Sequence, residues 1–108
     1  EAYRSHWQRY ETLGGLPVIY PMSSGWDKRP WGGSADDPLH DNSVATPDEF
    51  EAHIRAGLAA MLKTPSPRMG VVCCWNEFGE GSYIEPTKEM GAAVVERLGR
   101  VLNAGRAP

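Results

Sequence analysis

The sequence predicts an α/β fold in which helices and strands alternate in the order helix, strand, helix, strand, helix. Two observations predict it. Apolar residues recur at helical spacing in three segments, and two short apolar runs with β-branched residues lie between these segments. Because two parallel strands need a crossover between them, and a helix supplies one, we expect the strands to pair in parallel.

The first helix is expected at residues 2 to 13. The apolar positions that recur there at helical spacing are Tyr3, Trp7, Tyr10 and Leu13. Gly14 and Gly15 follow directly, and glycine readily adopts the left-handed conformation that ends helices. The pattern therefore predicts a helix that stops at this pair.

The first strand is expected at residues 16 to 20, which are short, apolar and partly β-branched. Pro17 lacks a backbone donor, so it suits the start of a strand. Residues 22 to 46 show no sustained periodicity and are rich in glycine, proline and short polar residues. We interpret them as a long loop, which in compact domains is often functional.

The second helix has a clear start signal. Thr46 offers a capping hydroxyl, Pro47 fits the first helical position, and Glu49 completes a capping box. The apolar positions that share one face of this helix are Phe50, Ile54, Leu58, Met61 and Leu62. Pro65 and Pro67 prevent its continuation.

The second strand is expected at residues 69 to 75, a nearly continuous apolar run that is typical of a strand buried on both faces. A last helix follows, with Thr87 as its expected cap and Gly105 just beyond its end. Its apolar stripe consists of Met90, Val94, Leu98, Val101 and Leu102.

Loop lengths indicate which α/β architecture the chain belongs to. The segments after the strands, residues 22 to 46 and 76 to 86, are long, whereas those after the helices are short. In a (β/α)₈ barrel the loops after strands build the active face. A doubly wound sheet shares this asymmetry, so periodicity alone leaves both architectures open.

The size of the chain favours a part of a fold. A whole barrel needs about 250 residues, and an independent sheet generally needs three or more strands. We therefore expect residues 1–108 to form a single partial domain, the C-terminal portion of a (β/α)₈ barrel. Such a chain should associate with itself or with the missing barrel portion.

Composition excludes several classes of partner. The formal net charge is −3, and the basic residues are scattered, which argues against nucleic acid. No apolar run approaches the roughly 18 residues of a membrane span. Position 1 is Glu1 rather than methionine, so we expect a processed or incomplete chain whose start gives no localisation.

The cysteines and histidines predict neither a metal nor a cofactor. Cys73 and Cys74 are adjacent, and neighbours on a strand point to opposite faces. We expect a small buried pair of thiols rather than a disulfide. His6, His40 and His53 lie far from this pair and form no ligand motif. We interpret His53 as a surface or packing residue of the second helix.

A pair of carboxylates follows the second strand within residues 75 to 82. Glu77 and Glu80 are three positions apart, with glycines on both sides of Glu80 that allow a tight turn. Like charges held close together raise the pKa of one carboxyl, which suits acid and base roles in glycosidic cleavage. Asn76 could orient a hydroxyl. The alternative interpretation is a solvated acidic turn.

Two segments carry a resemblance to a known family. Trp75-Asn76-Glu77-Phe78-Gly79-Glu80-Gly81-Ser82-Tyr83-Ile84-Glu85-Pro86 resembles the Trp-Asn-Glu-Trp-x-Glu-Gly signature and Leu/Ile-Glu-Pro ending of glycoside hydrolase family 99-like proteins. These include the endo-α-mannosidases and the WbsX-like proteins of polysaccharide gene clusters. Upstream, Gly25-Trp26-Asp27-Lys28-Arg29-Pro30-Trp31 is similar to the Gly-Trp/Tyr-Asp…Arg-Pro loop of the same families. The resemblance covers about residues 16 to 103.

The resemblance implies a (β/α)₈ barrel and a catalytic role for both acids. Glu77 corresponds to the base that acts on the 2-hydroxyl of the sugar, and Glu80 to the acid/base that protonates the leaving oxygen. The family is retaining and is thought to proceed through an anhydro-sugar, an exception to the scheme with a covalent carboxylate nucleophile. Phe78 departs from the family, which usually has tryptophan there.

The remaining site residues are expected to bind the substrate. They are Trp26, Asp27, Arg29, Trp31, Trp75, Asn76 and Tyr83. Trp26 and Trp31 can stack on sugar faces, or can form a hydrophobic lid over the barrel mouth. Asp27 and Arg29 can bind sugar hydroxyls, or can pair with each other and pin the loop.

Two functions remain open from the sequence. The first is a carbohydrate-active enzyme, a hydrolase or a glycosyltransferase, that acts on α-mannoside-like or bacterial polysaccharide linkages. The second is a non-catalytic glycan-binding or structural fragment of such a barrel, inactive in isolation. A glycan or oligosaccharide is the expected partner of both.

Overall fold

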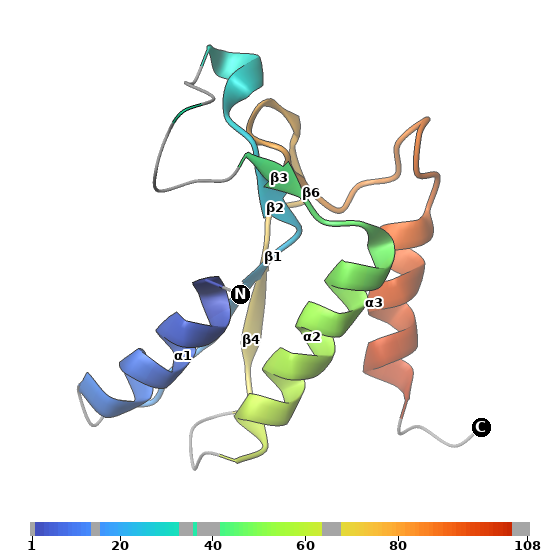
Figure 1. The fold of residues 1–108 in the computed structure, drawn as a ribbon. Helices are drawn as coiled ribbons and strands as arrows, with labels where there is room; N and C mark the ends of the chain where they lie inside the picture. The colour runs from blue at the N-terminus through green and yellow to red at the C-terminus, as the bar shows by residue number, and fades with distance from the viewer. Residues whose placement is uncertain (1, 14–15, 33–35, 37–41, 64–67, 105–108) are drawn as a thin grey trace.

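The computed structural model describes residues 2–13, 16–32, 36, 42–63 and 68–104 (Figure 1). Its elements in chain order are α1 (Ala2–Leu13), β1 (Tyr20–Ser23), β2 (Gly25–Trp26), η1 (Arg29–Trp31), β3 (Ser43–Val44), α2 (Pro47–Met61), β4 (Gly70–Cys73), β5 (Asn76–Glu77), η2 (Phe78–Glu80), β6 (Ser82–Tyr83) and α3 (Ala93–Asn103). The predicted alternation of helices and longer strands is confirmed, and short strands occupy the loops between them.

The two longer strands, β1 and β4, form the parallel pair that the alternation predicts. Tyr20 pairs with Gly70 and Ser23 with Cys73, and α2 makes the crossover between the strands. The carboxyl ends of both strands therefore lie at the same edge, and the loops that follow them leave from that edge (Figure 1).

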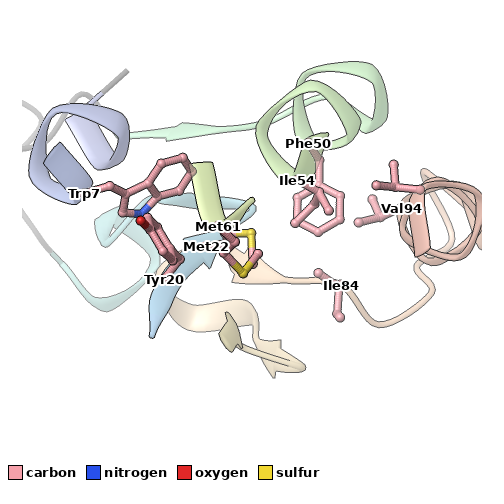
Figure 2. Packing of buried hydrophobic residues seen from close by; sticks show 9 residues of the cluster. Trp7, Tyr20, Met22, Phe50, Ile54, Met61, Ile84 and Val94 are labelled. Carbon is pink, nitrogen blue, oxygen red and sulfur yellow. The ribbon is translucent and has the colours of Figure 1, made fainter. Parts of the chain in front are cut away.

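Both α1 and α2 pack against one face of this strand pair. The ring of Trp7 in α1 meets Tyr20 edge-on with 5.6 Å between ring centroids, and its Nε1 donates to the Pro21 carbonyl at 2.9 Å. Gly57 of α2 lies over the side chain of Met22 and beside the indole of Trp7. A single helical layer thus covers the face that carries Tyr20 and Met22 (Figure 2).

The second half of the core lies between α2 and α3. Phe50 and Ile54 are buried against the apolar side of α3, near Val94 and Ile84 (Figure 2). Ion pairs border this core at the surface, and they join Arg97 to Asp48 at 2.6 Å and Glu51 to Arg55, Arg97 and Arg100.

The capping box at the start of α2 is confirmed. Glu49 N donates to Thr46 Oγ1 at 3.3 Å, and Thr46 N donates to the Glu49 carboxylate at 2.9 Å. The hydrogen bonds from Thr46 hold the pKa of Glu49 below its usual value. Pro47 is the first residue of the helix, as predicted.

The first strand begins later than predicted. It covers Tyr20–Ser23, whereas Leu16 and Ile19 lie before it and are exposed. Pairing with β4 decides the boundary, because the ladder starts at Tyr20 opposite Gly70. Pro21 fits within the strand since β4 is the one strand that pairs with β1 among the described residues.

The predicted burial of the second strand on both faces is wrong. Val71 is 55% exposed and Cys73 is exposed as well, while Val72 packs against the core. Alternate side chains of a strand point to opposite faces, and the helices cover one of these faces. The apolar run therefore forms a strand, but the described residues cover only one of its faces.

Some of the apolar positions predicted to pack, and the predicted cap of the last helix, are wrong. Tyr10, Leu13, Leu62 and Leu102 are exposed rather than packed, although Trp7, Met61, Val94 and Val101 are buried. Thr87 does not cap α3, because its hydroxyl accepts from Met90 N at 3.0 Å in a turn that precedes the helix. Helix α3 begins at Ala93, and its N-cap residue, Ala92, makes no side-chain hydrogen bond.

The cysteine prediction is also wrong. Cys73 and Cys74 form a disulfide, their peptide bond is cis, and their Cα atoms lie 3.2 Å apart. Cys73 is exposed and Cys74 is half-buried, so the predicted burial of the pair is wrong as well. The predicted breaks at Gly14, Gly15, Pro65, Pro67 and Gly105, and the residue His40, lie outside the described residues.

The described helices offer no membrane span, since each is too short or too polar to cross a bilayer.

Candidate functional site

The two motif loops meet at the carboxyl edge of the β1–β4 pair. The loop after β1 forms β2, η1 and β3, with β2 and β3 antiparallel, and the loop after β4 forms the antiparallel pair β5 and β6 around η2. The turns η1 and η2 lie against each other. Parallel strands bring loops that are distant in sequence to one edge, which is where α/β proteins place their sites.

A backbone hydrogen bond joins the two motifs directly. Asp27 N donates to the carbonyl of Glu80 at 2.6 Å. Gly81, the next residue, has a positive φ of 60°, and a Cβ there would lie 3.0 Å from Asp27 N and 2.9 Å from Val44 Cγ2. Glycine is therefore required at position 81 both by the backbone conformation and by the close approach of the first loop.

Serine hydroxyls connect the same loops beneath this contact. Ser24 Oγ donates to the Tyr83 carbonyl at 2.7 Å and accepts from Tyr83 N at 3.0 Å. The hydroxyls of Ser23 and Ser82 share a hydrogen bond of 2.9 Å, and all three serines are buried. The sequence analysis does not predict these contacts, although two adjacent serines between a strand and Gly25 indicate side chains that can hydrogen-bond to nearby backbone.

The second motif is closed at its base by Trp75. Its carbonyl accepts from Ile84 N at 3.0 Å and from Glu85 N at 2.9 Å. Within the loop the rings of Phe78 and Tyr83 lie 4.8 Å apart at 41°. Phe78, where the signature has tryptophan, is thus part of an aromatic pair.

Asp27 and Arg29 form a bidentate ion pair within the first motif. Arg29 Nε and Nη2 donate to the two carboxylate oxygens of Asp27 at 2.8 and 2.6 Å, and Arg29 N donates to Oδ1 at 3.1 Å. These hydrogen bonds lower the pKa of Asp27 and raise that of Arg29. Arg29 also donates to the carbonyl of Asn42 at 3.2 Å. The ion pair therefore stabilises the conformation of the first motif loop, which is one of the two roles that the sequence leaves open.

The predicted catalytic carboxylates lie on successive parts of the second motif. Glu77 ends β5 and is exposed, and Glu80 ends η2 and is half-buried beside Asp27. Asn76 is exposed and pairs in register with Tyr83 across β5 and β6. The short strands and the turn thus present these polar side chains at the edge of the sheet.

Aromatic side chains surround this edge. Trp31 is 76% exposed and lies on Gly79, and Trp26 and Trp75 are exposed at the bases of the two loops. The contacts of the described residues join Asp27 and Trp31 to the turn that carries Glu80. Trp26 instead belongs to the β2–β3 pair.

The rest of the described structure offers no metal centre, and it has a hollow apart from the motifs. The described residues contain no group of three or more histidine, cysteine or acidic residues that could hold a metal. An open hollow of about 360 Å³ is lined by Arg55, Leu58, Ala59, Leu62, Val101 and Ala104. Its lining comes from the carboxyl ends of α2 and α3, away from the motif loops (Figure 1).

Comparison with known proteins assigns the family. No curated protein and no solved structure matches the chain. The model of the family described as glycosyltransferase WbsX matches residues 2–98, which include both motif loops and both strands of the parallel pair. The chain therefore belongs to the WbsX glycosyltransferase family, whose members are carbohydrate-active proteins.

Proposed function

We propose that the two motif loops form part of a glycan-cleaving active site in which Glu77 is the base and Glu80 the acid/base. The observation that carries the proposal is the hydrogen bond from Asp27 N to the Glu80 carbonyl, 2.6 Å long. It fixes the backbone of one acid against the first motif, next to an exposed tryptophan, at the sheet edge that serves as the site in α/β folds.

The chemistry follows from the resemblance to family 99-like proteins. Glu77 takes the proton of the sugar's 2-hydroxyl, and that oxygen attacks the anomeric carbon. The bond to the leaving oxygen breaks, and Glu80 gives that oxygen its proton. In the second step Glu80 takes a proton from water, the water oxygen opens the anhydro-sugar, and Glu77 returns a proton to the 2-oxygen. With an alcohol in place of water, the same steps give transfer.

The substrate class is proposed to be α-mannoside-like or bacterial polysaccharide linkages. Family membership supports a glycan substrate. The exposed indole of Trp31 provides a flat apolar surface of the kind on which sugar rings stack.

We also propose that residues 1–108 are a partial domain of a (β/α)₈ barrel. Helices α1 and α2 cover the same face of the strand pair, whereas Val71 and Cys73 are exposed on the other. A doubly wound sheet carries helices on both faces, while a barrel keeps its helices outside and fills its interior with side chains. Val71 has the position expected of an inward-facing residue.

Substitution of the two carboxylates tests the catalytic proposal. In the full-length protein, Glu77→Gln and Glu80→Gln are each expected to lower turnover of α-linked manno-oligosaccharides by about 100-fold or more, measured as released reducing sugar. Glu89→Gln is the control, because Glu89 is exposed in the turn before α3. If both variants keep the turnover of the unsubstituted protein, the assignment is wrong.

A non-catalytic, glycan-binding role is the second candidate. The observation that favours it is the ion pair of Asp27 with Arg29, because this pair occupies the charged groups of the first loop. The exposed indoles of Trp26 and Trp31 then remain to contact a glycan by stacking. For the isolated chain we expect no detectable turnover. Hydrolysis by a purified monomer of residues 1–108 would contradict the partial-barrel proposal.

A further inference from the structure

Gly79 occupies the variable position of the signature, between the two carboxylates. It lies in the middle of η2 and is half-buried. The glycines with positive φ among the described residues are Gly25, Gly32, Gly81 and Gly91, so Gly79 is not among them. The backbone conformation at position 79 is therefore open to other residues, and the reason for glycine must lie in its surroundings.

The surroundings of Gly79 are the indole of Trp31. A Cβ at position 79 would overlap Nε1 and Cε2 of that ring and would lie 2.9 Å from its Cδ1. The indole thus rests on the main chain between Glu77 and Glu80. The side chain of Trp31 is 76% exposed, so the described residues cover little of it apart from this contact.

The same exposure decides what a larger residue at position 79 would do. The atoms in its way belong to an exposed side chain rather than to the backbone, so the ring can swing away without disturbing the fold. Gly81 differs, because a Cβ there would approach the main chain at Asp27 and the φ is positive. Alanine at 79 therefore displaces one ring, whereas alanine at 81 strains the loop.

We propose that Gly79 is a positioning residue for glycan binding: its lack of a side chain seats the Trp31 indole against the turn between the carboxylates. The ring then forms an aromatic wall beside the reacting sugar. This inference rests on the proposed function and deepens it, since it assigns a substrate-binding position to Trp31 and a reason for glycine at a variable place in the signature.

The test uses Gly79→Ala, Trp31→Ala and the double variant in the full-length protein. Indole N–H signals are followed by NMR, with the Trp31 signal assigned by its loss in Trp31→Ala. Affinity is measured by calorimetry with an α-linked mannotriose as the probe. Gly99→Ala is the control, because a Cβ there meets nothing within 4 Å.

Gly79→Ala is expected to shift the Trp31 signal, leave the other indole signals and the melting temperature unchanged, and weaken mannotriose binding about three- to tenfold. The double variant is expected to bind no more weakly than Trp31→Ala. An unchanged Trp31 signal in Gly79→Ala overturns the inference, and so does an equal loss of affinity in the presence and absence of Trp31.

The outcomes separate this inference from the proposed function. If the carboxylate variants lose turnover while Gly79→Ala and Trp31→Ala bind mannotriose normally, the active site stands and the positioning role is wrong. If the unsubstituted protein binds no α-linked mannotriose and cleaves no α-linked manno-oligosaccharide, the proposed α-mannoside-like substrate and this inference are both overturned.

Discussion

The two faces of the β1–β4 pair differ sharply in how the described residues cover them. On one face Tyr20 is 0% and Met22 4% exposed, beneath α1 and α2. On the other, Val71 is 55% exposed although it belongs to the same pair of strands. The contrast shows that the strand sequence is apolar on both sides, while the described helices cover one side alone.

This difference supports the partial-barrel proposal. An apolar run without alternation is typical of a strand enclosed on both faces. The helix-facing half of that expectation is met by Val72, which packs against the core, and the other half requires a layer beyond the described residues. The burial of Val71 in the full-length protein therefore measures whether a further layer covers this face, as the partial-barrel proposal requires.

The largest expected effect is on the covered face. Ile54, 1% exposed, contributes to the core between α2 and α3, so Ile54→Ala should lower the free energy of unfolding by about 2–5 kcal/mol. Urea denaturation of residues 1–108 and of the full-length protein measures it.

Val71→Ala is the matched substitution on the other face. In residues 1–108 it should change stability by less than about 0.5 kcal/mol, because the side chain is largely exposed. In the full-length protein it should cost about 1 kcal/mol or more if barrel side chains enclose it. An equally small effect in both proteins would contradict the barrel.

A smaller effect is expected at the start of α2, which links the helical layer to the first motif loop. Thr46→Ala removes the cap and should cost about 1 kcal/mol of stability. Thr46→Ser keeps the hydroxyl and is the control. Thermal unfolding that is the same for the alanine and serine variants would show that the capping box has no energetic role.

The smallest effect concerns the contact between α1 and α2. The ring of His53 stacks on Trp7 at 5.2 Å, and burial, with a contribution from Arg4, lowers the pKa of His53 from 6.5. The folded chain therefore binds this proton less readily than the unfolded chain. The contribution of His53 to the free energy of unfolding is therefore fully present above pH 6.5, and it is lost as the pH drops toward the lowered pKa.

His53→Gln removes this titration, so its stability should depend less on pH between 7.5 and 5 than that of the unsubstituted chain. Urea denaturation at several pH values measures the difference. His6→Gln, at an exposed position of α1, is the control. Equal pH dependence of His53→Gln and the unsubstituted chain would show that His53 has the same pKa in both states.

The sequence predicted what depends on local chemistry. The start of α2 follows from the Thr46 hydroxyl, Pro47 and Glu49, which interact within one helical turn. The order of the main elements also follows from local periodicity. The boundaries of β1 did not, because they depend on pairing with β4, a segment far along the chain.

In the candidate site, too, some features follow from local residues and others depend on contacts between distant segments. The two motifs are recognisable from their residues, and the loops after parallel strands are expected to lie on one face. The contact of Trp31 with Gly79 and the hydrogen bonds of Ser24 with Tyr83 join residues distant in sequence, so no local pattern reveals them. The burial of β4 likewise depends on what other chain segments cover it.

The two ends of the first motif loop are held together at its base. Ala45 N donates to the Ser24 carbonyl at 2.7 Å, so the chain enters and leaves the loop at adjacent points. The entropy of closing the loop grows only slowly with its length once its ends are held. Insertions between these two points should therefore leave both the strand before them and the helix after them in place. If the proposed function holds, changes within this loop can alter sugar specificity while the strand and the helix stay unchanged.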